Sequence, residues 1–166
     1  MRLDCRELIA TPGGKAPFAF DMDLSEFGFD GVKEFLTPVH VRGEIQNHAG
    51  LLELHAELTA DMLCECARCL KEFPKHFDLK TTAFLTEELE DEDNEDYYLL
   101  DDGVADLEEI ARNAFVLNFE QRILCREDCK GLCATCGKDL NDGPCDCGED
   151  QDPRWAALRQ LLGNND

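Results

Sequence analysis

The sequence has no apolar run near the roughly 18 residues that span a membrane, and its first residues lack the apolar stretch of a signal peptide. It contains no G-x-S-x-G, no H-E-x-x-H and no complete P-loop, because Gly13-Gly14-Lys15 lacks both the spaced glycine and the hydroxyl that would follow. These absences predict a cytoplasmic protein that is not an enzyme and has neither a membrane nor a small-molecule substrate as its partner.

Positive charge is also scarce. Lys and Arg total 16 against 37 Asp and Glu, a formal net charge of -21. Nucleic acids and anionic membranes would repel such a chain at long range, so a basic protein is the better partner. Residues 87–102 contribute ten of the carboxylates and no Lys or Arg. We predict an acidic loop there, either a solvated connection or a docking strip for a basic partner.

The length of 166 residues suits one main core with a small appendage, and ten Phe supply bulky apolar groups to fill it. We expect a sheet domain over residues 1–122, including the acidic loop, and a cysteine-rich segment with a short terminal helix over residues 123–166.

Large apolar residues alternate with polar ones in several stretches, which predicts strands with one buried face. The strands are expected at 18–24, in a hairpin at 39–45 and 52–62, and at 75–85. Residues 25–34 suggest a turn or short helix. The period changes at Asp106, which predicts a helix ending near Phe119, and a terminal helix is expected at 152–163. The fold class is therefore α+β: an antiparallel sheet packed by one main helix, with a cysteine-rich, zinc-binding C-terminal segment.

Ten cysteines are unexpected in a reducing cytoplasm, where metal binding is a better explanation than disulfides. Eight of them occur as close pairs, the usual way in which a chain delivers thiolates to zinc. The predicted ligands are Cys66, Cys69, Cys125, Cys129, Cys133, Cys136, Cys145 and Cys147, whereas Cys5 and Cys64 are bystanders.

The eight cysteines can be divided between metals in more than one way. Cys133, Cys136, Cys145 and Cys147 lie close enough in sequence to close one local site, which leaves Cys66/Cys69 and Cys125/Cys129 to share another. An alternative partition pairs Cys66/Cys69 with Cys133/Cys136, and the chain could also bind a single ion. The cysteines could instead be redox thiols or ligands of an iron–sulfur cluster. We expect one or two structural zinc ions, because four sulfur ligands leave no open position for water.

Basic residues surround the first cysteine pair. Arg68, Lys71 and Lys75 are candidate binding residues that could contact phosphates, although an ordinary charged surface explains them as well. Arg68 lies inside the Cys66-to-Cys69 turn, where it either forms a functional contact or neutralises the metal–thiolate cluster.

Two motifs resemble those of a known family. Cys66-Ala-Arg-Cys69-Leu70, and Cys129-Lys-Gly-Leu-Cys133-Ala-Thr-Cys136-Gly137-Lys-Asp-Leu140-Asn141 followed by Asp152-Pro153-Arg154, are similar to the YceD family, the large ribosomal RNA subunit accumulation proteins. Ala134 stands where many members have Pro. The resemblance implies a non-catalytic ribosome biogenesis factor needed for accumulation of large-subunit (23S) ribosomal RNA.

The resemblance leaves the direct partner open between ribosomal RNA and a basic ribosomal protein or assembly factor. The alternative function is a thiol-redox or zinc-transfer protein, which would need an exposed, reactive cysteine.

Overall fold

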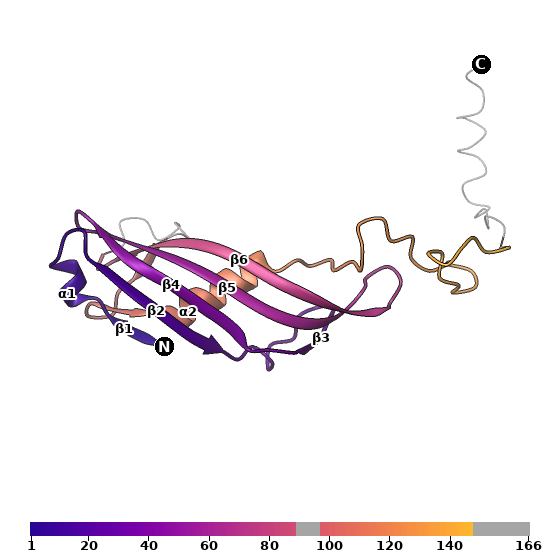
Figure 1. Ribbon diagram of the computed structural model, residues 1–166, viewed down its shortest axis with the longest axis horizontal. Coiled ribbons are helices and arrows are strands. Elements are labelled where there is room, and N and C mark those ends of the chain that lie inside the picture. Colours follow the sequence, from indigo (N-terminus) through magenta and orange to yellow (C-terminus); the bar gives the residue numbers. More distant parts are fainter. Residues whose placement is uncertain (89–96, 148–166) are drawn as a thin grey trace, which may run out of the picture.

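The computed structural model describes residues 1–88 and 97–147. The elements are β1 (Arg2–Asp4), α1 (Arg6–Ile9), β2 (Lys15–Met22), β3 (Val32–Phe35), β4 (Val39–His48), β5 (Leu51–Glu65), β6 (Glu72–Thr86), β7 (Tyr97–Leu99), β8 (Val104–Asp106) and α2 (Leu107–Asn118). Figure 1 shows a long twisted sheet with α2 against one face and the C-terminal segment extending from one end.

The main sheet has the strand order β2-β4-β5-β6-β7, with β3 beside the far end of β5. All of its pairs are antiparallel except β6 with β7. The alternation in the sequence places the buried side chains on one face, and those of β5 are Leu52, Leu54, Ala56, Leu58, Ala60, Met62 and Cys64. The expected hairpin and third strand are confirmed, and both are longer than the sequence pattern indicated.

The helix α2 covers the buried face of the sheet. Its N-terminus is capped by Asp106, whose carboxylate accepts hydrogen bonds from the backbone N–H groups of Glu108 and Glu109. Phe115 is fully buried and packs 4.4 Å, between ring centroids, from Phe77 of β6. The helix predicted from Asp106 to near Phe119 is therefore confirmed, together with the α+β fold class.

Three parts of the chain differ from the prediction or lie outside the described residues. The turn expected within residues 25–34 is confirmed at Ser25–Glu26 and Asp30–Gly31, but the end of this segment enters β3, which begins at Val32 and pairs with β5. The predicted acidic loop 87–102 is wrong at its C-terminal end, where β7 pairs with β6 and Tyr97 packs 5.2 Å from Phe84. Aromatic side chains at 97 and 98 outweigh the neighbouring carboxylates there. The helix expected at 152–163 lies outside the described residues.

The β5–β6 hairpin reaches toward the same end of the molecule as the segment that follows α2 (Figure 1). A hydrogen bond and an ion pair join the hairpin to this segment. Ile123 is buried in the main core, and its carbonyl accepts a hydrogen bond from the N–H of Ala67 at 2.9 Å. Lys75 of β6 forms an ion pair with Glu120. The chain after α2 is thus directed toward the hairpin turn, where the first cysteines lie.

The central strands meet so closely at Gly43 that a side chain would not fit. A Cβ atom there would lie 2.1 Å from the backbone oxygen of His55 and 2.7 Å from the ring of Phe18. We predict that Gly43→Ala lowers the free energy of unfolding by about 2–3 kcal/mol, since the strands must separate to admit the methyl group.

Thermal or urea denaturation followed by circular dichroism measures this loss. Gly28→Ala is the matched control, because its Cβ would meet nothing within 4 Å, and it should remain within about 0.5 kcal/mol of wild type. Equal stability of the two variants would show that the sheet tolerates the methyl group.

Candidate metal centre

Two clusters of four cysteines are formed in the part of the chain that the structure describes. In each cluster the four Sγ atoms lie within 4.8 Å of one another. The first cluster contains Cys66, Cys69, Cys125 and Cys129, and the second contains Cys133, Cys136, Cys145 and Cys147. This is the partition that joins the hairpin turn to the segment after α2. Each cluster can hold one metal ion.

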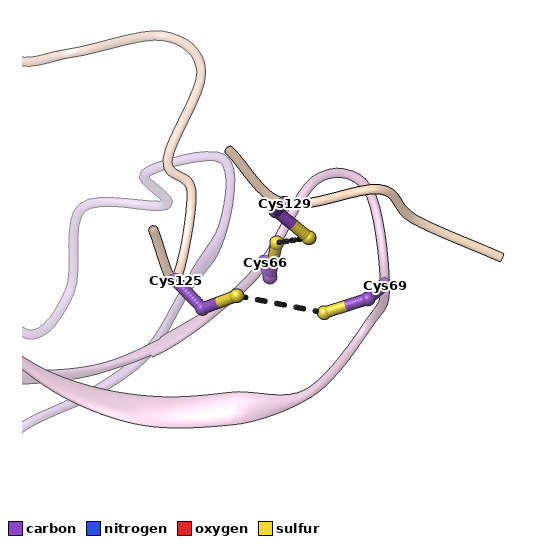
Figure 2. Close-up of side chains that lie close together, drawn as sticks. All are labelled: Cys66, Cys69, Cys125 and Cys129. Carbon is purple, nitrogen blue, oxygen red and sulfur yellow. Dashed lines mark hydrogen bonds between the residues drawn. The ribbon is translucent and has the colours of Figure 1, made fainter. Parts of the chain in front are cut away.

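The sulfur spacing of the first cluster suits a tetrahedral ion. The Sγ atoms of Cys66 and Cys129 are 3.7 Å apart, and so are those of Cys69 and Cys125 (Figure 2). Metal–sulfur bonds of about 2.3 Å in a tetrahedron place neighbouring sulfurs about 3.8 Å apart. Figure 2 shows the four side chains pointing toward a common centre, with one pair from the hairpin turn and one from the later segment. The first cluster therefore has the geometry of a closed site.

The two clusters differ in exposure. In the first, Cys66 is fully buried and Cys69 and Cys129 are nearly so. In the second, Cys136 is exposed and its three companions are half-buried. An ion in the first cluster would be shielded by protein on most sides, whereas the second cluster is open to solvent at Cys136.

The two C-x-x-C turns have the same backbone hydrogen bonds. In the first, Cys66 N–H donates to the carbonyl of Lys71 at 2.9 Å and Leu70 N–H donates to that of Cys66 at 2.9 Å. In the second turn the N–H of Cys133 donates to Lys138 at 2.8 Å, and that of Gly137 to Cys133 at 2.9 Å. The sequences CARCLK and CATCGK share this equivalence, since both are C-x-x-C motifs with Ala after the first cysteine and Lys two residues after the second.

The residue after the second cysteine of each turn has a positive φ. Gly137 has φ 73° and Leu70 has φ 59°. A glycine adopts this conformation without strain, but a leucine is strained there, at a cost of about 1–2 kcal/mol. Leu70 is also 57% exposed. The closed turn around Cys66 and Cys69 keeps Leu70 in this strained conformation.

Backbone N–H groups point at the sulfurs and favour their ionised form. Burial raises the pKa of the Cys66 thiol, but N–H groups of Cys125, Cys69 and Arg68 outweigh it and lower the pKa to about 6. The N–H groups of Cys136 and Thr135 lower the pKa of Cys133 to about 6 as well. Each cluster thus contains a cysteine prepared to bind as a thiolate.

At least one cysteine in each cluster has a raised pKa instead, which favours the neutral thiol. Burial, followed by the nearby sulfurs, raises the pKa of Cys125 to about 12, and contact with Cys136, followed by burial, raises that of Cys147 to about 12. Four thiolates this close repel one another, and a dication at their centre removes that repulsion. The donor set therefore fits a metal ion that prefers sulfur.

Asn141 connects the two clusters. It follows the second C-x-x-C turn, yet its Nδ2 lies 3.4 Å from Sγ of Cys129 in the first cluster. Its Oδ1 accepts hydrogen bonds from the N–H of Lys130 at 2.8 Å and from Arg126 at 2.7 Å. The amide therefore supports a sulfur of one cluster from the loop of the other, which makes the two clusters one structural unit.

The three predicted binding cations each have a partner in the segment after α2. Arg68 donates to the backbone oxygen of Cys129 at 2.7 Å, and Lys71 pairs with Asp139 at 2.8 Å. This pairing is the main reason that the pKa of the Asp139 carboxyl falls to about 2. Lys75 pairs with Glu120. The structure thus places all three at the junction of hairpin and C-terminal segment, and their role in binding a partner stays a prediction.

The remaining cysteines lie apart from the clusters. Cys5 and Cys64 are buried in the main core, and burial raises the pKa of both thiols. All ten cysteines lie in the described part of the chain and are free. Within that part, too, we find no helix with the length and apolar character needed to cross a bilayer.

The family model described as "Large ribosomal RNA subunit accumulation protein YceD" matches residues 54–162, which include all eight clustered cysteines. The chain belongs to the YceD family. This family has no known catalytic activity.

Curated relatives of this YceD chain occur in mycobacteria. Uncharacterized proteins of Mycobacterium tuberculosis and Mycobacterium bovis are 34% identical over 112 residues, which cover 64% of this chain and 53% of theirs. An uncharacterized protein of Mycobacterium leprae is 27% identical over 165 residues, covering 92% of this chain and 75% of its own. The chain thus spans about half the length of the first two relatives. No solved structure matches it significantly.

The amide of Asn141 provides a test of the link between the clusters. We predict that Asn141→Ala lowers the zinc affinity of the first cluster about tenfold, because Cys129 loses its side-chain hydrogen-bond donor and Lys130 its acceptor. Competition with a chromogenic chelator measures the affinity, in a Cys133→Ser, Cys136→Ser background that isolates the first cluster. Asn113→Ala on α2 is the control. An unchanged affinity in the Asn141 variant would show that the contact is incidental.

Proposed function

We propose that this chain is a non-catalytic factor in ribosome biogenesis, needed for the accumulation of large-subunit (23S) ribosomal RNA, and that two structural zinc ions fold its C-terminal segment and hold it to the β5–β6 hairpin turn. The observation that carries the proposal is the pair of four-cysteine clusters within the segment that matches the YceD family. Family membership implies a role in accumulation of the large ribosomal RNA subunit.

Zinc is the ion that best suits the clusters. All four donors in each are sulfur, and the spacing in the first is that of a tetrahedron of zinc–sulfur bonds. When bound, zinc would supply a cross-link rather than a reaction, because four cysteine ligands leave no open coordination position. Arg68 and Lys71 would add to this cross-link, because their hydrogen bond and ion pair also connect the C-terminal segment to the hairpin.

The charge of the chain supports a basic protein as its direct partner in the cytoplasm. A net charge of -21 attracts a cationic ribosomal protein or assembly factor at long range and repels free ribosomal RNA. The cations near the first cluster are already paired with Asp139, Glu120 and backbone oxygens. They are therefore less available to phosphates than the sequence alone suggests.

One observation favours a second candidate function, a thiol-redox or zinc-transfer protein. Cys136 is exposed, so the second cluster could exchange its metal with an acceptor. In that case zinc would leave the second cluster rapidly when an acceptor thiol is added. A structural role requires that both ions remain bound.

Metal content tests whether the clusters hold the ions that the structural role requires. We predict two zinc ions per chain in native mass spectrometry after purification without added metal. Cys66→Ser should reduce the content to one ion or none, whereas Cys64→Ala should retain two, because Cys64 lies outside both clusters. A content of zero in freshly purified wild-type protein would contradict the structural role of zinc.

The cellular role has its own test. We predict that cells in which the Cys66→Ser variant replaces the wild-type protein accumulate less 23S than 16S ribosomal RNA, since loss of the first cluster frees the C-terminal segment. Cys64→Ala cells should accumulate both at the wild-type ratio. A normal 23S level in cells that lack the protein altogether would contradict the proposed function.

A further inference from the structure

A groove lies between the C-terminal end of α2 and the loop that connects β2 to β3. Its volume is about 620 Å³. Its lining includes Phe27, Phe29, Asp30, Val116, Leu117 and Phe119. Three of these carry large apolar side chains into solvent: Phe27 is 45% exposed, Val116 49% and Leu117 67%. Scattered apolar residues are normal on a surface, but three that line one hollow mark an interaction site.

The floor of the groove is rigid. The ring of Phe29 lies 4.8 Å from that of Phe119 and 5.3 Å from that of Phe115, between centroids. Phe115 is fully buried in the main core. Because this aromatic cluster belongs to the core, the groove exists before any partner binds, and little ordering of the protein opposes binding.

The electrostatics of the groove are negative. Asp30 is the only charged residue among its lining residues that the structure describes. The last turn of α2, which lies wholly in the described part, has no basic side chain, so its carbonyl ends contribute their partial negative charge unopposed. Arg112 lies 5.7 Å above the ring of Phe27, and Glu108 pairs both with Arg112 at 3.3 Å and with the N-terminal ammonium group at 2.8 Å. The negative charge that a partner meets at the groove therefore comes from Asp30, the end of α2 and the net charge of -21.

The apolar lining of the groove and the negative charge around it indicate the chemistry of its partner. We propose that this groove binds an amphipathic segment of a basic protein, with leucine-like side chains in the hollow and Lys or Arg facing Asp30 and the end of α2. A volume of about 620 Å³ admits a few apolar side chains of such a segment. A second copy of this chain, with its charge of -21, is a poor occupant. The class of partner, a basic protein, rests on the proposed function, and the groove is the surface that would bind it.

A labelled peptide tests the groove directly. The probe is a 14-residue helical peptide with Leu at i, i+3, i+4 and i+7 and Lys elsewhere, and fluorescence anisotropy against the metal-loaded full chain gives its affinity. We expect the double variant Val116→Gln, Leu117→Gln to bind it at least tenfold more weakly, because both contacts in the hollow are lost. The matched control is Leu99→Gln on β7, which is 56% exposed and should bind as wild type does.

A scrambled peptide of the same composition separates apolar docking from general attraction to an acidic protein. It should bind at least tenfold more weakly than the amphipathic one. Equal affinities for the two peptides, or for the wild type and the groove variant, would overturn the proposal. So would sedimentation velocity showing a dimer that the groove variant abolishes, or an RNA oligonucleotide that competes for the groove.

The cellular readout distinguishes failure of this proposal from failure of the proposed function. If the groove is the docking surface, cells carrying the double groove variant should lose 23S ribosomal RNA relative to Leu99→Gln cells. A normal level with the groove variant, in a strain where deletion of the protein lowers 23S, overturns the groove alone. A normal level in the deletion strain overturns the proposed function.

Discussion

The first cysteine cluster joins two parts of the chain that are distant in sequence, and the arrangement of the C-terminal segment depends on this connection. Cys66 and Cys129 are 63 residues apart, yet their sulfurs lie within 4 Å of each other. From Leu124 onward the described segment adds only Cys129 to the buried apolar residues. Hydrophobic burial therefore cannot hold it. The hydrogen bond from Arg68 to Cys129 is only partly buried, and the ion pair of Lys71 with Asp139 is exposed on the lysine side, so each contributes little by itself. In the proposed function, a metal ion bound to the first cluster supplies the missing free energy.

Much of the fold could be predicted from the sequence. Period-two alternation gave the strands of the β4–β5 and β5–β6 hairpins, and Asp106 marked the start of α2. The division of eight cysteines into two sets was also accessible, since Cys133 to Cys147 are close enough in sequence to close on themselves. The β3 and β7 strands could not be predicted from the sequence, because each is only a few residues long and forms through its pairing with a neighbouring strand.

The cysteine ligands of the candidate site could be predicted from the sequence, but most of the contacts and backbone conformations around them could not. The residue type at Leu70 disfavours a positive φ, and the turn imposes that conformation against the preference of the residue. In the sequence only the equivalent position of Gly137 in CATCGK indicates it. The contact from Asn141 to Cys129 depends on how the second C-x-x-C turn folds back. The partners of Arg68 and Lys71 likewise appear only when hairpin and C-terminal segment meet. The proposed groove joins a loop and a helix about 90 residues apart, so no local pattern could reveal it.

The most direct test of the account is hydrogen exchange of the whole chain with and without metal. After complete removal of zinc by a chelator, the amides of residues 123–147 and of the hairpin turn around Ala67, whose N–H donates to Ile123, should exchange rapidly. The amides of β4, the central part of β5 and α2 should keep their protection, since their burial does not depend on the clusters. Unchanged protection of residues 123–147 in the metal-free protein would contradict the claim that a metal ion holds this segment in place.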